Sequence, residues 1–108
     1  MRKMFRPISK RDLKDTMTVC TPKLDGTYSE PVAIIGVQFQ QTDKVSDDKH
    51  RSSVSGGIVF VDAVNSAGAF EVPVSSRVAV RGRSYVVRKC HRCEDLFGRC
   101  HHWELEVG

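Results

Sequence analysis

The segment His101–Val107 reads HHWELEV, and it decides the fold class because its residues alternate with the two-residue period of a β-strand. Trp103, Leu105 and Val107 fall on one face of such a strand, and polar side chains fall on the other. This pattern is typical of a strand with one face against a core and one toward solvent. The chain shows no helical periodicity longer than a turn or two.

Five further stretches indicate strands, at residues 16–21, 32–40, 58–63, 77–80 and 84–89. Turn-forming residues separate them, and residues 90–99 are expected to form a loop before the last strand. Gly36, inside the second stretch, predicts a bulge or bend. The sequence therefore predicts a mainly β protein: a small antiparallel β-barrel or sandwich of about six strands.

The length of 108 residues supports a single domain covering residues 1–108, with a net charge of +4. Residues 1–14 form a basic lead-in, in which Ser9 is expected to cap a short helical turn. Such basic stretches are typical of solvated surface, or of contact with nucleic acid or an acidic protein. No apolar run approaches the roughly 18 residues of a membrane span, so we expect no membrane partner and a cytoplasmic chain.

The segment of residues 42–55 is polar, Ser-rich and mixed in charge, and it lies between the second and third predicted strands. A connection this long is unusual in so small a domain, and such loops are usually functional or disordered. We expect a long flexible loop with a purpose of its own. Its candidate functional residues are Lys44, Asp47, Asp48, Lys49, His50 and Arg51.

A cluster of three cysteines and three histidines occupies thirteen residues near the C-terminus. The Cys90-x-x-Cys93 spacing suits half of a tetrahedral zinc site, and Cys100 and His102, two apart on a strand, could supply the other half. His101 would then face the opposite way. Because the second CxxC pair of a standard zinc ribbon is absent, reduced thiols and surface histidines in a connecting loop are the alternative.

Catalytic arrangements are not recognisable in the sequence. A cysteine nucleophile needs a neighbouring base and a residue that orients it, and no such set is identifiable. Asp62 and Asn65, at the end of a buried strand, are expected to form a turn by hydrogen bonding to nearby backbone amides. The sequence therefore predicts no enzyme, no small-molecule substrate and no cofactor, with zinc left open.

The order of segments along the chain carries a family resemblance. Its most specific parts are the Asp62-x-x-Asn65-Ser66 motif and the His-His-Trp-Glu ending. The further parts are residues 8–13, 15–19, a strand containing Val37, residues 58–66, Gly82-x-x-Tyr85-x-Val87 and residues 101–106. From about residue 8 to residue 107, the chain resembles the minor capsid proteins of tailed phages and prophages. That family is similar in layout to head-completion, or stopper, proteins.

The resemblance implies a structural subunit of the head–tail connector, forming a stopper ring below the portal and its adaptor. The implied partners are copies of the chain itself, with twelvefold symmetry expected in the virion, together with portal and adaptor proteins, tail proteins and packaged double-stranded DNA. In stopper proteins a long loop between the second and third strands enters the central channel, which would place residues 42–55 toward DNA. The implied location is the virion head–tail junction, after the host cytoplasm.

Other functions remain open at this point. Within the connector, a stopper is favoured over a tail terminator, and over an adaptor, which would be mainly helical. Outside it, the alternative is a small zinc-stabilised nucleic-acid-binding domain, suggested by Cys90-x-x-Cys93 and an isoelectric point of about 9.0. The family resemblance lends no support to a metal at the cysteine cluster.

Overall fold

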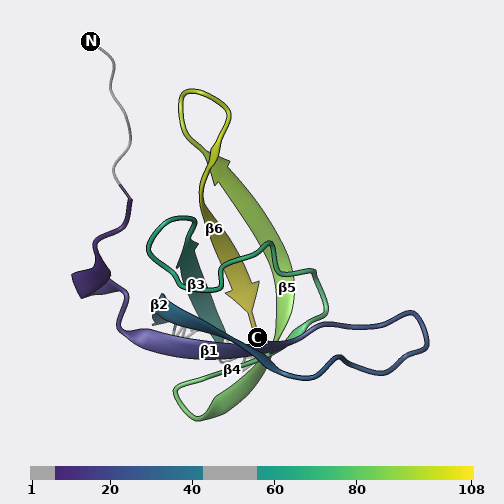
Figure 1. Ribbon diagram of the computed structural model, residues 1–108. Coiled ribbons are helices and arrows are strands. Elements are labelled where there is room, and N and C mark those ends of the chain that lie inside the picture. The colour runs from purple at the N-terminus through teal and green to yellow at the C-terminus, as the bar shows by residue number, and fades with distance from the viewer. Residues whose placement is uncertain (1–6, 43–55) are drawn as a thin grey trace, which may run out of the picture.

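Six antiparallel strands close into a barrel in the computed structural model, which describes residues 7–42 and 56–108 (Figure 1). The strands are β1 (Asp15–Cys20), β2 (Val32–Thr42), β3 (Gly56–Asp62), β4 (Arg77–Val80), β5 (Arg83–Glu94) and β6 (Cys100–Val107). Their order around the barrel is β1-β2-β3-β6-β5-β4, and β4 closes it by pairing with β1. The mainly β prediction is confirmed, and the barrel is realised instead of the sandwich.

One hydrophobic core fills the barrel, built from alternate residues of its strands. Met17, Val59, Val61 and Leu105 are fully buried, and Trp103 is 8% exposed. Branched aliphatic side chains suit this interior because they pack well on a pleated surface. Since each buried aliphatic side chain contributes about 1.5–3 kcal/mol, this core is a major source of the barrel's stability.

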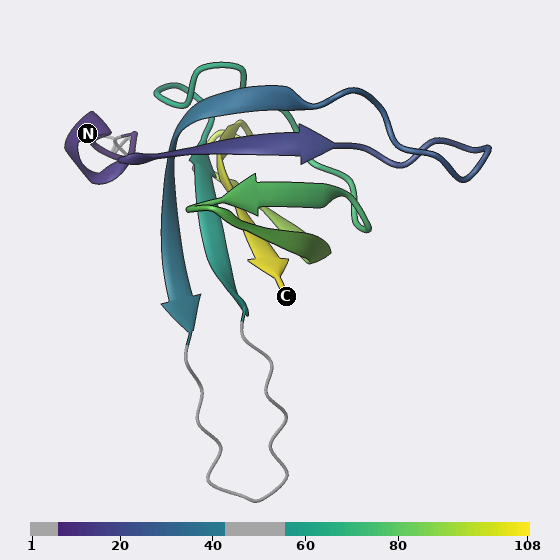
Figure 2. The ribbon, with the colours of Figure 1, turned by 90° about the horizontal axis from the view of Figure 1, so that it is seen from below.

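Gly36 makes the bend in β2 that the sequence predicts. Its φ is +90°, a backbone conformation that costs other residues roughly 1–2 kcal/mol. Asp15 of β1 pairs with Val37 and Thr16 pairs with Ile35, so Gly36 is the extra residue of a bulge. The bend lets one long strand pair with β1 before it and with β3 after it, and Figure 2 shows β2 turning this corner.

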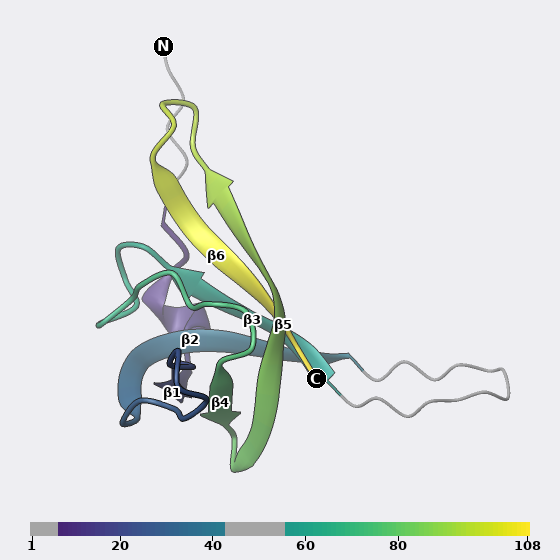
Figure 3. The same ribbon diagram turned by 90° about the vertical axis from the view of Figure 1, so that its right-hand side faces the viewer.

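Within residues 7–42 and 56–108, two projections extend beyond the barrel (Figure 1), and Figure 3 shows the β5–β6 hairpin rising from it. The β1–β2 arm comprises residues 21–31, and the β5–β6 arm comprises residues 91–102, the distal part of the β5–β6 hairpin. The prediction of a loop over residues 90–99 is wrong, because β5 continues to Glu94 in register with β6. The true loop is limited to residues 95–99.

The lead-in folds as predicted where the structure describes it. Ser9 caps a 3-10 helix, η1 (Lys10–Asp12), and its hydroxyl accepts a hydrogen bond from the Arg11 backbone N–H. No helix within residues 7–42 and 56–108 has the length and apolarity needed to cross a membrane.

Candidate functional site

Asp62 is the centre of a buried hydrogen-bond network at the end of β3. Its side chain is fully buried, and its Oδ2 accepts hydrogen bonds from the backbone N–H groups of Val64 (2.9 Å) and Asn65 (2.8 Å). Its Oδ1 accepts a third, from the Ile8 N–H at 2.9 Å. The turn predicted for this motif is confirmed, and the same carboxylate also fixes the N-terminal segment to the barrel.

The two other polar residues of the motif extend this network. Asn65 donates from Nδ2 to the Ile8 carbonyl at 2.8 Å, which completes a two-sided clamp on that residue. Ser66 accepts from the Asp62 N–H at 2.8 Å and donates to the carbonyl of Gly36. The motif therefore joins the lead-in, the bulge of β2 and the end of β3, and its role is architectural.

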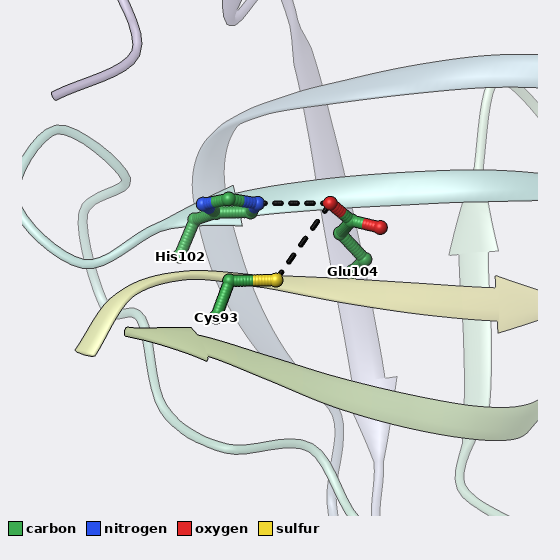
Figure 4. A group of neighbouring side chains, drawn as sticks. All are labelled: Cys93, His102 and Glu104. Carbon is green, nitrogen blue, oxygen red and sulfur yellow. Dashed lines mark hydrogen bonds and ion pairs between the residues drawn. The ribbon is translucent and has the colours of Figure 1, made fainter. Parts of the chain in front are cut away.

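Three side chains of different chemistry meet on the outer face of the β5–β6 arm (Figure 4). Cys93 lies on β5, and its pairing partner His102 lies on β6 two residues before Glu104. One carboxylate oxygen, Glu104 Oε2, is 3.0 Å from His102 Nε2 and 3.7 Å from Cys93 Sγ. All three side chains are half-buried. The cross-strand register, not sequence proximity, brings Cys93 to the other two.

The environment of Cys93 is that of a protonated thiol. Desolvation raises the pKa of Cys93, and the charge and hydrogen bond of Glu104 raise it further. A nucleophilic cysteine needs the opposite, a lowered pKa beside a base. Here the carboxylate lies between the thiol and the imidazole, so the arrangement is not a nucleophile–base pair.

The predicted metal-ligand set of Cys90, Cys93, Cys100 and His102 is divided between two environments in the structure. The fold brings together Cys93 and His102, but Cys90 and Cys100 pack against the hydrophobic core instead. Burial is the first cause of the raised pKa of each of these two thiols.

His101 is also placed differently from the prediction that it faces away from His102. The pairing register between β5 and β6 shifts between Cys93 and Glu94, so β6 carries an extra residue there. The two imidazoles consequently lie together, with their Nδ1 atoms 2.8 Å apart and their rings edge to face. An irregularity of this kind places neighbouring side chains on one side of a strand.

The tip of the β1–β2 arm is an ordered turn that exposes a leucine. Asp25 Oδ1 accepts hydrogen bonds from the Thr27 N–H at 3.0 Å and the Thr27 hydroxyl at 2.6 Å. The threonine hydroxyl is the main cause of the lowered pKa of Asp25. Lys23 and Thr27 are joined by a backbone hydrogen bond of 2.8 Å, and Leu24 between them is fully exposed.

The tip of the β5–β6 arm has the same construction. Asp95 Oδ1 accepts from the N–H groups of Phe97 (2.8 Å) and Arg99 (3.0 Å), and these bonds, that of Arg99 first, lower the pKa of Asp95. The loop exposes 63% of Leu96 and 52% of Phe97. Large apolar side chains at two ordered tips are features that sequence reasoning missed, although the Asp25-Gly26 turn itself was signalled.

The remaining predicted site residues, Lys44, Asp47, Asp48, Lys49, His50 and Arg51, lie outside the described residues. Glu104 was missed as a site residue, since a charge on the outer face of a strand is ordinarily solvated. The signal that could have found it is its two-residue spacing from His102, which puts both on one face.

The described residues thus form a small closed β-barrel, with the N-terminal segment clamped to it by Asp62 and Asn65. Its distinctive surface features are the two ordered arms. The chain belongs to the minor capsid protein family, whose sequence model matches residues 10–107. Membership supports a structural role in a phage particle and a location in the virion. Neither a curated protein nor a solved structure matches the chain.

Proposed function

We propose that the chain is a subunit of a phage head–tail connector, a head-completion or stopper ring below the portal and adaptor. It would dock the tail and help retain packaged DNA. Family membership supplies the structural role in the particle. The observation that carries the finer proposal is the pair of ordered arms with exposed apolar tips on an otherwise closed barrel.

The closed barrel limits how copies of the chain can assemble. Open sheets associate readily through unpaired strand edges, whereas closure removes those edges. Each of the six described strands pairs with two neighbours around the barrel. Contacts through the closed part of the barrel would therefore use side chains and projections, not continuation of the sheet.

The arms are suited to such contacts because they are ordered before binding. Leu24, Leu96 and Phe97 offer apolar surface, and the hydrogen bonds of the two tip aspartates hold their loops in place. A preordered loop loses less conformational entropy on binding than a flexible one. Exposed apolar side chains on stiff projections are thus well placed to enter a hollow on a neighbouring copy, or on the portal, adaptor or tail.

The predicted channel loop has a defined origin on the barrel. Thr42, the last residue of β2, pairs with Gly56, the first residue of β3, so the described ends of the two strands lie side by side. We propose that this segment faces the channel and contacts packaged DNA. Its three basic and three acidic residues would give a weak, salt-sensitive contact, which suits DNA that must later leave.

Substitution at the arm tips tests the docking proposal. Leu24→Ser and the double variant Leu96→Ser/Phe97→Ser should fold normally, because these side chains are exposed in the monomer. Incorporation into heads, measured by quantitative mass spectrometry of purified particles, should fall at least tenfold for each.

Val64→Ser is the matched control, since Val64 is 71% exposed but belongs to neither arm. It should be incorporated like the unsubstituted chain. Normal incorporation of both arm variants would show that the arms are not the docking elements. A chain absent from the head–tail junction in electron micrographs of such particles would overturn the connector assignment itself.

The zinc-stabilised nucleic-acid-binding domain has no comparable support. The family match is to a capsid protein, and the barrel has a continuous hydrophobic core of its own.

A further inference from the structure

We propose that Cys93, His102 and Glu104 form a divalent-metal site, best suited to Zn²⁺, that joins the two strands of the β5–β6 arm. The proposal concerns the arm alone and is independent of the connector function. It also differs from a zinc-dependent fold, because these residues lie outside the hydrophobic core of the barrel.

Distances between the three donor atoms already approach those of a tetrahedral site. Zinc bonds of about 2.0–2.3 Å to nitrogen, oxygen and sulfur put neighbouring ligand atoms about 3.3–3.7 Å apart. Glu104 Oε2 lies 3.0 Å from His102 Nε2 and 3.7 Å from Cys93 Sγ, and all three atoms lie within 4.8 Å of one another. Small side-chain rotations would therefore admit an ion, with a fourth position left for water.

The chemistry of the donors selects the class of metal. A thiolate, an imidazole and a carboxylate together suit a borderline-soft ion such as Zn²⁺ and are unlike the all-oxygen sets of Mg²⁺ and Ca²⁺. Binding requires loss of the Cys93 thiol proton, which is now directed at Glu104, and a shift of the His102 ring proton from Nε2 to Nδ1, which frees Nε2 for the ion. The ion would take over the place of that proton and of the His102–Glu104 hydrogen bond.

The surroundings of His102 resemble those of a metal-binding histidine. Such residues almost always hydrogen-bond through the second ring nitrogen, which fixes the ring. His102 Nδ1 is 2.8 Å from His101 Nδ1, and its ring also lies 6.2 Å from that of Phe60 on β3. The ring is thus held with Nε2 toward Cys93 and Glu104.

Such a site would stiffen the arm just below its tip. Cys93 is the penultimate residue of β5, and the register shift next to it weakens the pairing with β6. An ion held by Cys93 from one strand and by two residues from the other would lock the hairpin at this point.

The experiment titrates the purified, reduced, metal-free full-length chain with Co²⁺ and then displaces it with Zn²⁺. We expect one ion per chain and a thiolate-to-cobalt charge-transfer band. Zn²⁺ should also protect Cys93 from alkylation in the unsubstituted chain, while Cys20 is modified as before. Near-UV circular dichroism of Trp103 should show that the barrel stays folded when the ion is removed.

Variants assign the ligands. Cys93→Ala and Glu104→Gln should lose stoichiometric binding, and His101→Ala should weaken it by about 10–100-fold, as loss of a supporting hydrogen bond does. Cys90→Ala and Cys100→Ala are the matched controls and should bind as the unsubstituted chain does. The proposal is overturned if cobalt shows no thiolate band, if Cys93 is not protected, or if the controls lose the ion while Cys93→Ala keeps it.

Discussion

At the scale of single residues, the most informative side chain is Asp62. Burying a carboxylate is costly unless hydrogen bonds replace its water. Asp62 is fully buried and accepts three backbone N–H groups, two from its own turn and one from Ile8, 54 positions away in the sequence. The turn was predictable from residue types, because Asp and Asn bond nearby amides. The clamp on Ile8 was not, since no local pattern records a partner so distant in the chain.

Asp62→Asn should lower the free energy of unfolding by about 1–3 kcal/mol. The amide keeps one acceptor oxygen but turns an NH₂ group toward a backbone N–H, so at least one buried donor loses its partner. Urea denaturation measures the loss, and amide exchange should show the Ile8 N–H opening well before the core.

The comparison for this change is Asp12→Asn, which alters an exposed carboxylate of η1 by the same chemistry. It should leave the free energy of unfolding equal, within error, to that of the unsubstituted chain. Equal effects of the two substitutions, or an Ile8 amide as protected as before, would contradict the clamp.

At the scale of elements, alternation predicted which side chains of β1, β6 and the later part of β2 face the core. Met17, Val37 and Leu105 are all buried as their spacing indicates. Alternation indicates no strand over residues 90–94, because beyond Cys90, which packs against the core, most side chains of this part of β5 are polar and exposed. A strand without a buried face has no period-two signal, and the register shift beside Cys93 has no sequence signature. For these two reasons the spacing of the cysteines and histidines did not indicate that Glu104 lies beside Cys93 and His102.

The β5–β6 arm tip should loosen in acid. Its hydrogen bonds lower the pKa of Asp95, so its contribution to local stability is complete above the unfolded value of about 3.9. That contribution is lost as the pH falls through the lower folded value. Amide chemical shifts of Phe97 and Arg99, followed below about pH 4, should report this transition.

Asp95→Asn should abolish the pH-dependent change in the chemical shifts of those two amides. The shift of the Thr27 amide, which is bonded to Asp25 in the other arm, should still change with pH. If the Phe97 and Arg99 shifts move only with global unfolding, the tip is not held by Asp95.

At the scale of the whole molecule, the residues that stabilise the barrel are different from those proposed to make contacts during assembly. The core is built from the barrel strands, so the exposed side chains at the arm tips can change without loss of core contacts. The two described arms and the connection between β2 and β3 leave the barrel at different places. One subunit could therefore contact its neighbours through the arms and use residues 43–55 for a separate contact. In the proposed ring, that contact is with DNA in the channel.

Replacing residues 43–55 with Asn-Gly tests that division. Thr42 and Gly56 are already paired, and a two-residue Asn-Gly turn suits the ends of such a hairpin. The shortened chain should fold and enter particles normally, but the particles should lose packaged DNA, measured as nuclease-accessible DNA after head filling.

A full-length variant with Lys44, Lys49 and Arg51 changed to Gln separates charge from bulk, because it keeps the segment's length and removes its attraction to phosphate. Leakage in both variants assigns retention to the basic side chains, and leakage in the shortened chain alone assigns it to the bulk of the segment in the channel. Full retention by the shortened chain would remove the segment from any role in holding DNA, and failure to enter particles would make it an assembly element instead.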